Sequence, residues 1–310
     1  MSLPRTAALT LAASAGASAL AGQAARALCP PLGRQMRLDG GRLHVLDRPG
    51  PGPQAPTVLM IHGLCGVLNH FSALMPLLPQ ARIIAYDRWG AGHSDPAPRG
   101  AEALVAQAAL AAQLLERLGT GPVVVVGHSL GGAVALRLAL DRPDLVRGLV
   151  LLAPLSRAFR HGAARLSGRL GAWPPLRKAA IHTLNLPGVL AASPVMLHGA
   201  FHPDPVPPGL LTTGGGVLAL QPKMIEGATR DLRVVNHDMA ALEADLPSLA
   251  CPVTMLWGRG DRVLDPAHHG PGFARIVPQT TLATIAGGHM LPLCHPRICA
   301  LAIRDMLDAA

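Results

Sequence analysis

Residues 123–132 read Val-Val-Val-Val-Gly-His-Ser-Leu-Gly-Gly, and residues 133–137 continue as Ala-Val-Ala-Leu-Arg. The four valines predict a strand buried on both faces, because such strands are continuous apolar runs. The apolar residues after Gly132 predict a helix. Between them, the Gly-x-Ser-x-Gly pattern around Ser129 is typical of a sharp turn that lifts a serine hydroxyl above the end of a sheet. Glycine suits the turn because it has no Cβ. Ser129 is therefore the first candidate nucleophile.

On both sides of this turn, short apolar runs alternate with helical patterns. The runs that suit strands covered on both faces are 57–61, 83–86, 123–126, 148–152, 253–257 and 281–285. The helical patterns are 101–118, 132–140 and 295–307. This alternation predicts an α/β fold with a mostly parallel central sheet and helices on both faces. Two extended runs, 35–38 and 42–46, come earlier and predict an antiparallel pair joined at Asp39-Gly40-Gly41.

The alternation is interrupted between residues 155 and 246, where no strand pattern occurs and prolines are frequent. About ninety residues are too many for an ordinary connection, so we predict a mainly helical insertion that covers the sheet as a lid. The expected organisation is an N-terminal segment, 1–29, a core built from 30–154 and 247–310, and the lid insertion, 155–246.

The N-terminal segment carries Arg5 and then an uncharged stretch, 6–25, rich in Ala, Ser, Thr and Gly. It is compatible with an exported signal peptide, with a marginal membrane anchor and with a helical cytosolic extension. Export or membrane association through residues 1–29 is the favoured expectation for localisation. Other charge-free stretches, such as the one from Ala179, are interrupted by Pro, Gly and His, so any membrane link is expected at the N-terminus.

Composition excludes several classes of protein. Half of the residues are hydrophobic and 15% are charged, which excludes a chain disordered as a whole. The 27 basic residues are scattered arginines for the most part and aromatic residues are only 3%, so nucleic acid is not an expected partner. The densest basic run, from Arg157 to Arg177, suits a solvated helix face or a contact with anionic lipid or substrate. Five cysteines without zinc-type spacing predict neither a metal site nor a disulfide framework.

A serine hydroxyl needs a base, and the base needs a group that orients it. His289 is the candidate base, because Gly287-Gly288-His289 follows the predicted strand 281–285 at the sheet edge where α/β proteins place their sites. His295 competes, but His295-Pro296 is typical of a helix start.

Three aspartates are candidates for the orienting acid. Asp261 lies in the loop just after the predicted strand 253–257 and is favoured. Asp265 precedes Pro266 and suits a helix cap, and Asp238 is the outside candidate. The chain order is then serine, acid, histidine.

Attack by Ser129 places negative charge on a carbonyl oxygen, which backbone N–H groups can stabilise. The N–H of Leu130 lies at a helix start, where the helix dipole favours negative charge. The second donor is expected from the loop His62-Gly63-Leu64-Cys65-Gly66, with Leu64 N–H as the choice. Cys65 is expected to line the site.

With these residues in place, the chain from Gln35 to the C-terminus resembles the lid-bearing esterase, lipase and peroxidase-like group of α/β-hydrolases. His62-Gly63 and the segment 87–94, Asp-Arg-Trp-Gly-Ala-Gly-His-Ser, are also similar to that group, with Asp87 and Arg88 expected in the scaffold. The resemblance implies a serine hydrolase that cleaves an ester or related acyl bond of a small molecule through an acyl-enzyme, without metal or organic cofactor. Thioester, lactone or carbon–carbon hydrolysis, acyl transfer and cofactor-free peroxidase activity stay open.

Apolar residues of the lid insertion favour either an apolar acyl group or ordinary packing. They are Met196, Leu197, Leu210, Leu211, Leu218 and Met224. A different class of function also stays open, namely a non-catalytic, membrane-tethered ligand-binding or accessory protein on the same fold. The oligomeric state is not determined by the sequence.

Overall fold

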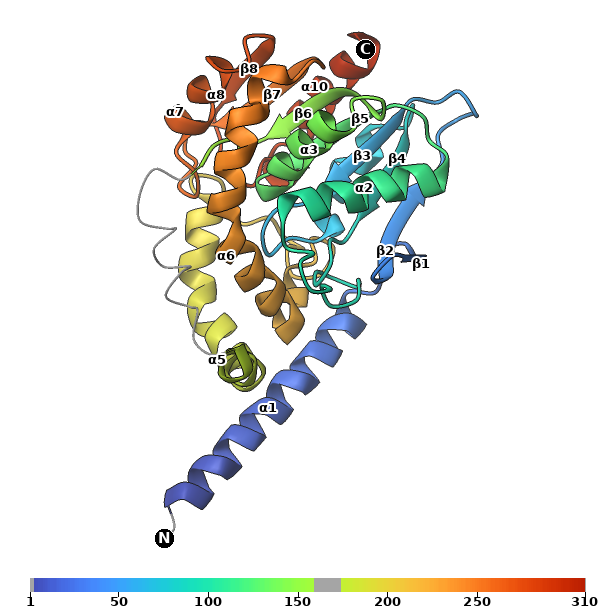
Figure 1. Cartoon of the computed structure of the whole chain (residues 1–310). Helices are drawn as coiled ribbons and strands as arrows, with labels where there is room; N and C mark the ends of the chain where they lie inside the picture. The colour runs from blue at the N-terminus through green and yellow to red at the C-terminus, as the bar shows by residue number, and fades with distance from the viewer. Residues whose placement is uncertain (1–2, 159–173, 310) are drawn as a thin grey trace.

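The computed structural model describes residues 3–158 and 174–309, and its centre is one eight-stranded sheet (Figure 1). The strand order is β1-β2-β4-β3-β5-β6-β7-β8, and all pairs from β4 to β8 are parallel. Strands β1 and β2 join this sheet in antiparallel fashion. The bounds are β1 Arg34–Leu38, β2 Gly41–Arg48, β3 Thr57–Ile61, β4 Arg82–Tyr86, β5 Val123–His128, β6 Val146–Leu152, β7 Val253–Gly258 and β8 Thr280–Ile285. The predicted α/β class is confirmed.

Helices cover both faces of the sheet (Figure 1). The long ones are α1 Leu3–Leu28, α2 Leu104–Leu118, α3 Leu130–Asp141, α5 Pro174–Phe201, α6 Pro222–Asp245 and α10 Pro296–Ala309. The short ones are α7 Pro266–His269, α8 Pro271–Ala274 and α9 Leu291–Cys294. Single 3₁₀ turns occur at η1 Leu68–Phe71, η2 Met75–Leu77, η3 Gly216–Leu220 and η4 Leu246–Ser248. Most of the basic run that begins at Arg157 lies outside the described residues.

The two faces of the sheet are separate apolar cores because side chains alternate along a strand. In β3, Leu59 and Ile61 point into the core that also holds α2 and α3. Their neighbours Val58 and Met60 point into the opposite core, with η1 and α10. All four side chains are fully buried. The continuous apolar run in the sequence therefore reflects burial on both faces.

Strand β8 departs from the expectation of burial on both faces. It is the last strand of the sheet and pairs only with β7. All six of its residues are exposed or half-buried. Its sequence, Thr-Thr-Leu-Ala-Thr-Ile, alternates polar and apolar residues in part, as suits an edge strand.

The insertion is helical in its described part, with α5, η3 and α6. The second half of α6 packs into the main core through Val235, Met239 and Leu242, so it covers the body of the domain directly. The division of the chain at residues 155 and 246 remains a prediction. Two of the apolar residues noted above, Leu211 and Met196, are exposed. Leu210, Leu218 and Met224 are buried in small clusters, and Leu197 packs against one of them.

The N-terminal segment is helix α1, which projects from the domain and passes beside α5 (Figure 1). Among the described residues, one helix is long and apolar enough to cross a membrane, and it is Arg177–Phe201 within α5. The most membrane-compatible stretch of the described chain therefore lies in the insertion, whereas the sequence pattern pointed to the N-terminus.

Candidate active site

Ser129 lies between strand β5 and helix α3, at the carboxyl edge of the sheet. Its backbone has φ 54° and ψ −122°, a conformation that L-residues rarely adopt and that marks a strained turn. The turn lies tightly against β3, because a Cβ on Gly131 would stand 2.1 Å from the carbonyl oxygen of Ile61. Glycine at 131 is therefore obligatory, and the strained backbone keeps the Ser129 hydroxyl at the edge of the sheet.

The structure brings Ser129, His289 and Asp261 together in one hydrogen-bonded chain, which we call the relay. His289 Nε2 lies 2.9 Å from Ser129 Oγ, and His289 Nδ1 lies 2.7 Å from Asp261 Oδ2. All three residues are less than a tenth exposed. The carboxylate accepts a hydrogen bond from Nδ1–H, which leaves Nε2 as the acceptor for the serine hydroxyl.

Asp261 is held by its own loop after β7. Its Oδ1 accepts the backbone N–H groups of Val263 and Leu264, at 2.8 and 3.0 Å. One carboxylate oxygen therefore fixes the loop while the other faces His289. Because the Asp261 carboxylate is fixed by these backbone hydrogen bonds, it holds the imidazole of His289 in one orientation.

The competing candidates have other partners. Asp265 caps α7, with Oδ1 accepting from Ala267 N–H at 3.0 Å. Asp238 accepts from the backbone N–H of Leu104 at the start of α2. His295 precedes α10, and its Nε2 lies 3.0 Å from Asp204 Oδ1. None of the three contacts the relay.

The proposed oxyanion donors lie on the two segments that meet at Ser129. Leu130 is the first residue of α3, so its N–H has no partner within the helix. The loop 62–66 approaches so closely that a Cβ on Gly63 would stand 2.7 Å from Ser129 Cβ. Within the described residues, no hydrogen-bond acceptor faces the N–H of Leu64.

The carbonyl oxygen of Gly63 fixes that loop. It accepts from His62 Nδ1 at 2.9 Å, from Arg88 Nη2 at 3.1 Å and from Gly66 N–H at 3.1 Å. His62 Nε2 in turn accepts the N–H of Arg88 at 2.9 Å, so the imidazole is neutral. Burial, and then the nearby Arg88 guanidinium, lowers the pKa of His62 to about 3.

Arg88 connects this loop to the lid insertion. Its Nη1 lies 2.9 Å from Asp231 on α6 and 2.5 Å from Gln107 on α2. Both charged side chains are largely buried. Burial raises the pKa of Asp231, an effect that Arg88 opposes.

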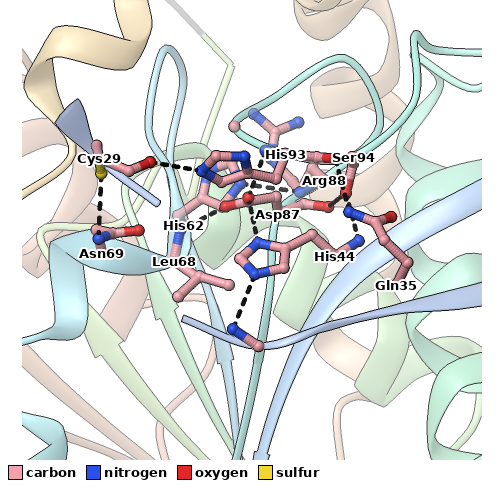
Figure 2. Close-up of polar contacts among 12 residues, drawn as sticks. Cys29, Gln35, His44, His62, Leu68, Asn69, Asp87, Arg88, His93 and Ser94 are labelled. Atoms are coloured by element: carbon pink, nitrogen blue, oxygen red, sulfur yellow. Dashed lines mark hydrogen bonds and ion pairs between the residues drawn. The ribbon is translucent and has the colours of Figure 1, made fainter. Parts of the chain in front are cut away.

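Asp87 organises a second buried cluster, drawn in Figure 2. Its carboxylate accepts from His44 Nδ1 at 2.7 Å and from the N–H groups of Leu68 and His93, both at 2.8 Å. Burial alone would raise the pKa of Asp87, but these hydrogen bonds and nearby histidines hold it at about 2. As expected of scaffold residues, neither Asp87 nor Arg88 contacts the relay.

The same cluster holds the chain where α1 ends. His93 Nε2 donates to the carbonyl oxygen of Cys29 at 2.9 Å, and His44 Nε2 accepts the N–H of Gly33 at 3.0 Å (Figure 2). Asn69 donates to Cys29 Sγ at 3.6 Å. The exit from the N-terminal helix is therefore bonded to the core rather than loosely attached.

Two supports of His289 were not predicted. His128 Nε2 donates to the carbonyl oxygen of His289 at 3.0 Å, and burial lowers the pKa of His128 well below its usual value. Asp204 Oδ2 accepts the N–H of Gly288 at 2.9 Å. In the sequence, Asp204 is marked only by its place between two prolines. It lies far from His289 along the chain, so nothing local connects the two residues.

The arrangement suits nucleophilic attack on a carbonyl group, because a serine, a base, an orienting acid and two backbone donors meet at one point. Within the described residues, no group of three or more His, Cys, Asp and Glu side chains is arranged to hold a metal ion.

Comparison with known proteins gives a consistent family. A family model described as "alpha/beta hydrolase fold" matches residues 56–296. A magnesium-chelatase 30 kDa subunit of Rhodobacter capsulatus is 28% identical over 253 residues, 78% of this chain and 83% of that protein. Lipase LipV of Mycobacterium tuberculosis is 50% identical over 105 residues, 33% of this chain and 39% of the lipase. The structure of a thermophilic esterase from Thermogutta terrifontis with malate bound matches with a TM-score of 0.71 at 24% identity, covering 89% of this chain and 96% of the esterase.

Proposed function

Because the chain belongs to the α/β-hydrolase fold family, we propose that it is a serine hydrolase that cleaves a carboxylic ester or related acyl bond through an acyl-enzyme. The observation that carries the proposal is the relay, whose two hydrogen bonds of 2.7 and 2.9 Å run from Asp261 through His289 to Ser129. A protein that only bound a ligand at this site would not need this sequence of acid, base and hydroxyl.

In the proposed reaction, Ser129 Oγ attacks the carbonyl carbon while its proton passes to His289 Nε2. The carbonyl oxygen becomes negatively charged and faces the N–H groups of Leu64 and Leu130. When the tetrahedral intermediate collapses, the carbon–oxygen bond to the leaving group breaks and the proton on His289 passes to the leaving oxygen. Asp261 stabilises the imidazolium and stays ionised throughout.

Water then hydrolyses the acyl-enzyme. In this half of the reaction water is the nucleophile and Ser129 Oγ is the leaving group. His289 takes a proton from water as the water oxygen attacks the acyl carbon, and returns it to Ser129 Oγ as the ester bond breaks. The products are a carboxylic acid and an alcohol, so atoms and charges balance without a metal or redox cofactor.

An apolar acyl group is the substrate class that the surroundings favour. A buried apolar cluster is formed by Phe201 at the end of α5, Met290 directly after His289, and Leu210 in the loop between α5 and η3. The lipase among the relatives supports an acyl substrate of this kind. Side chains of this cluster would contact acyl carbons better than polar groups.

The test is hydrolysis of a chain-length series of p-nitrophenyl esters by the full chain, with Ser129→Ala measured alongside. We expect the substitution to lower turnover on the order of 10⁴ to 10⁶ and leave the fold intact. The chain length with the highest kcat/KM measures the acyl pocket. If Ser129→Ala keeps most of the activity, the assignment of the nucleophile is wrong.

A second candidate function is favoured by one comparison. One relative, aligned over 83% of its own length, is a magnesium-chelatase 30 kDa subunit, whereas two putative carbamate hydrolases align over 86% and 94% of theirs. The alternative, which the sequence also leaves open, is a membrane-tethered accessory protein that holds a ligand at this site without turning it over.

An organophosphonate probe separates the two functions, because it labels a serine only when a neighbouring base activates the hydroxyl. Labelling of the wild type but not of Ser129→Ala supports the hydrolase. No labelling and no ester turnover support the accessory protein.

A further inference from the structure

Helix α5 is mostly apolar after Arg177 and Lys178 and lies almost entirely outside the core. Its segment Arg177–Phe201 is long and apolar enough to cross a membrane, yet only 6% of its most apolar window is buried. The core helix of a soluble protein would be mostly buried, and a signal sequence would lie near the N-terminus. Helix α5 is neither, so its apolar exposure needs another explanation.

Helix α1 packs beside α5 and extends the same apolar region. Ser14 Oγ donates to the carbonyl oxygen of Thr183, and Ser18 Oγ accepts the N–H of Leu186 at 3.2 Å. Figure 1 shows α1 running past α5 and projecting beyond the domain. At 26 residues, α1 is about 39 Å long.

The exposed apolar side chains concentrate on this helix pair. Among the described residues, fifteen large hydrophobic side chains are exposed, and eight of them lie on α1 and α5. We call these eight the α1–α5 surface, and they are Leu9, Leu11, Leu20, Leu28, Leu184, Leu190, Val195 and Met196. Leu9 and Leu20 are eleven residues apart, about three turns, so both lie on the same side of α1, whereas Leu11 lies on the opposite side.

Neither helix contains an acidic residue. Together they carry four basic residues, which are Arg5, Arg26, Arg177 and Lys178. Apolar side chains on helices that lack acids, with Arg26 and Lys178 among their cations, are the composition that binds anionic lipid.

Helix α5 cannot cross a bilayer while the domain stays folded. Before it, Ser156 Oγ donates to His269 O at 2.7 Å, and after it, Asp204 accepts from Gly288. Both ends are thus attached to the same domain, on the same side of any membrane. A spanning α5 would require a return crossing by residues 159–173, which contain three arginines. The helix therefore suits a position in the plane of the membrane surface.

We propose that the α1–α5 surface docks peripherally on a bilayer that contains anionic phospholipid. The apolar side chains enter the headgroup region, and the basic residues face the phosphates. Helix α5 ends at Phe201, which packs with Met290 next to His289. The docked surface would therefore adjoin the candidate active site. The docking itself does not rest on the proposed hydrolase activity.

The test is co-sedimentation of the full chain with vesicles of phosphatidylcholine, with and without phosphatidylglycerol, at low and high salt. The test variant is Leu190→Glu/Val195→Glu on α5. The matched control is Val105→Glu/Leu301→Glu, which adds the same two charges at exposed apolar positions of α2 and α10. The far-ultraviolet circular dichroism of each variant reports on folding.

We expect the wild type to bind vesicles that contain phosphatidylglycerol more tightly than those without it, and less tightly at high salt. The test variant should bind about tenfold or more weakly, and the control should bind as the wild type does. The proposal is overturned if the wild type binds neither vesicle, or if both double variants lose binding equally. It is also overturned if self-association, lost only in the test variant, replaces vesicle binding, because the surface would then join two copies of the chain.

Discussion

Asp204, which lies three residues after the end of α5, accepts a 2.9 Å hydrogen bond from the backbone N–H of Gly288, the residue before His289. The other oxygen of the same carboxylate faces His295 Nε2 at 3.0 Å. The fit is close, since a Cβ on Gly288 would stand 2.2 Å from the carbonyl oxygen of His202. The insertion is thus bonded to the loop that carries the candidate base.

Removal of this carboxylate should affect catalysis more than folding. We expect Asp204→Ala to lower kcat about tenfold with little change in KM, because His289 is less well positioned for proton transfer. The control is Asp265→Ala, which removes a carboxylate that also accepts a backbone N–H, at 3.0 Å, but caps α7. That variant should lose about 1 kcal/mol of stability and keep its kcat. Equal kcat values in the two variants would show that Asp204 has no positioning role.

Asp261→Asn should lower kcat on the order of 10⁴, because an amide NH₂ cannot hold the tautomer of His289 that accepts the serine proton. The Asn side chain still accepts the N–H groups of Val263 and Leu264, so the loop keeps its shape. Steady-state kinetics on the best p-nitrophenyl ester measure the effect. The control is Asp238→Asn on α6, whose carboxylate accepts the N–H of Leu104 at the start of α2. Activity lost there instead would transfer the role of the acid to Asp238.

Gly63→Ala should lower kcat/KM on the order of 10², because the new methyl group would stand 2.7 Å from Ser129 Cβ and force the loop of Leu64 away from Ser129. The matched control is Gly52→Ala, where no heavy atom lies within 4 Å of the added Cβ. A Gly63→Ala protein as active as the control would contradict the assignment of Leu64 N–H as an oxyanion donor.

Stability should decrease as the pH falls below about 6.5. Burial is the main cause that lowers the pKa of His62 to about 3 and that of His70 to about 4. Between these values and about 6.5, the unfolded chain binds protons that the folded chain does not, so unfolding becomes more favourable as the pH falls. Urea unfolding between pH 7 and 5 measures the slope. His62→Gln should lower that slope by up to one proton, and His237→Gln, at an exposed position, should leave it unchanged. Equal slopes in all three proteins would contradict the prediction.

Much of the candidate site was predictable because its signals are local. The strained turn at Ser129, the glycines before His289 and the cap at Asp265 are each written in a few consecutive residues. Burial of β8 was overestimated although its sequence carries a local signal, because Thr281 and Thr284 interrupt the run 281–285 with polar residues. Which strand forms the edge of the sheet depends on pairing with strands far away in the chain.

The sequence by itself determined the order of strands and helices, the parallel α/β class, and the serine, acid and histidine that meet at the end of the sheet. These features follow from periodicity and turn chemistry, which act between neighbouring residues. Only the tertiary structure decided that Asp204 bonds to the histidine loop, that Arg88 joins Gly63 to α6, and that α5 lies outside the core. Each of these features depends on contacts between residues far apart in the chain. The physical reason is that the burial of a side chain and its hydrogen-bond partners depend on which elements pack against it, and the composition of its own segment does not determine that.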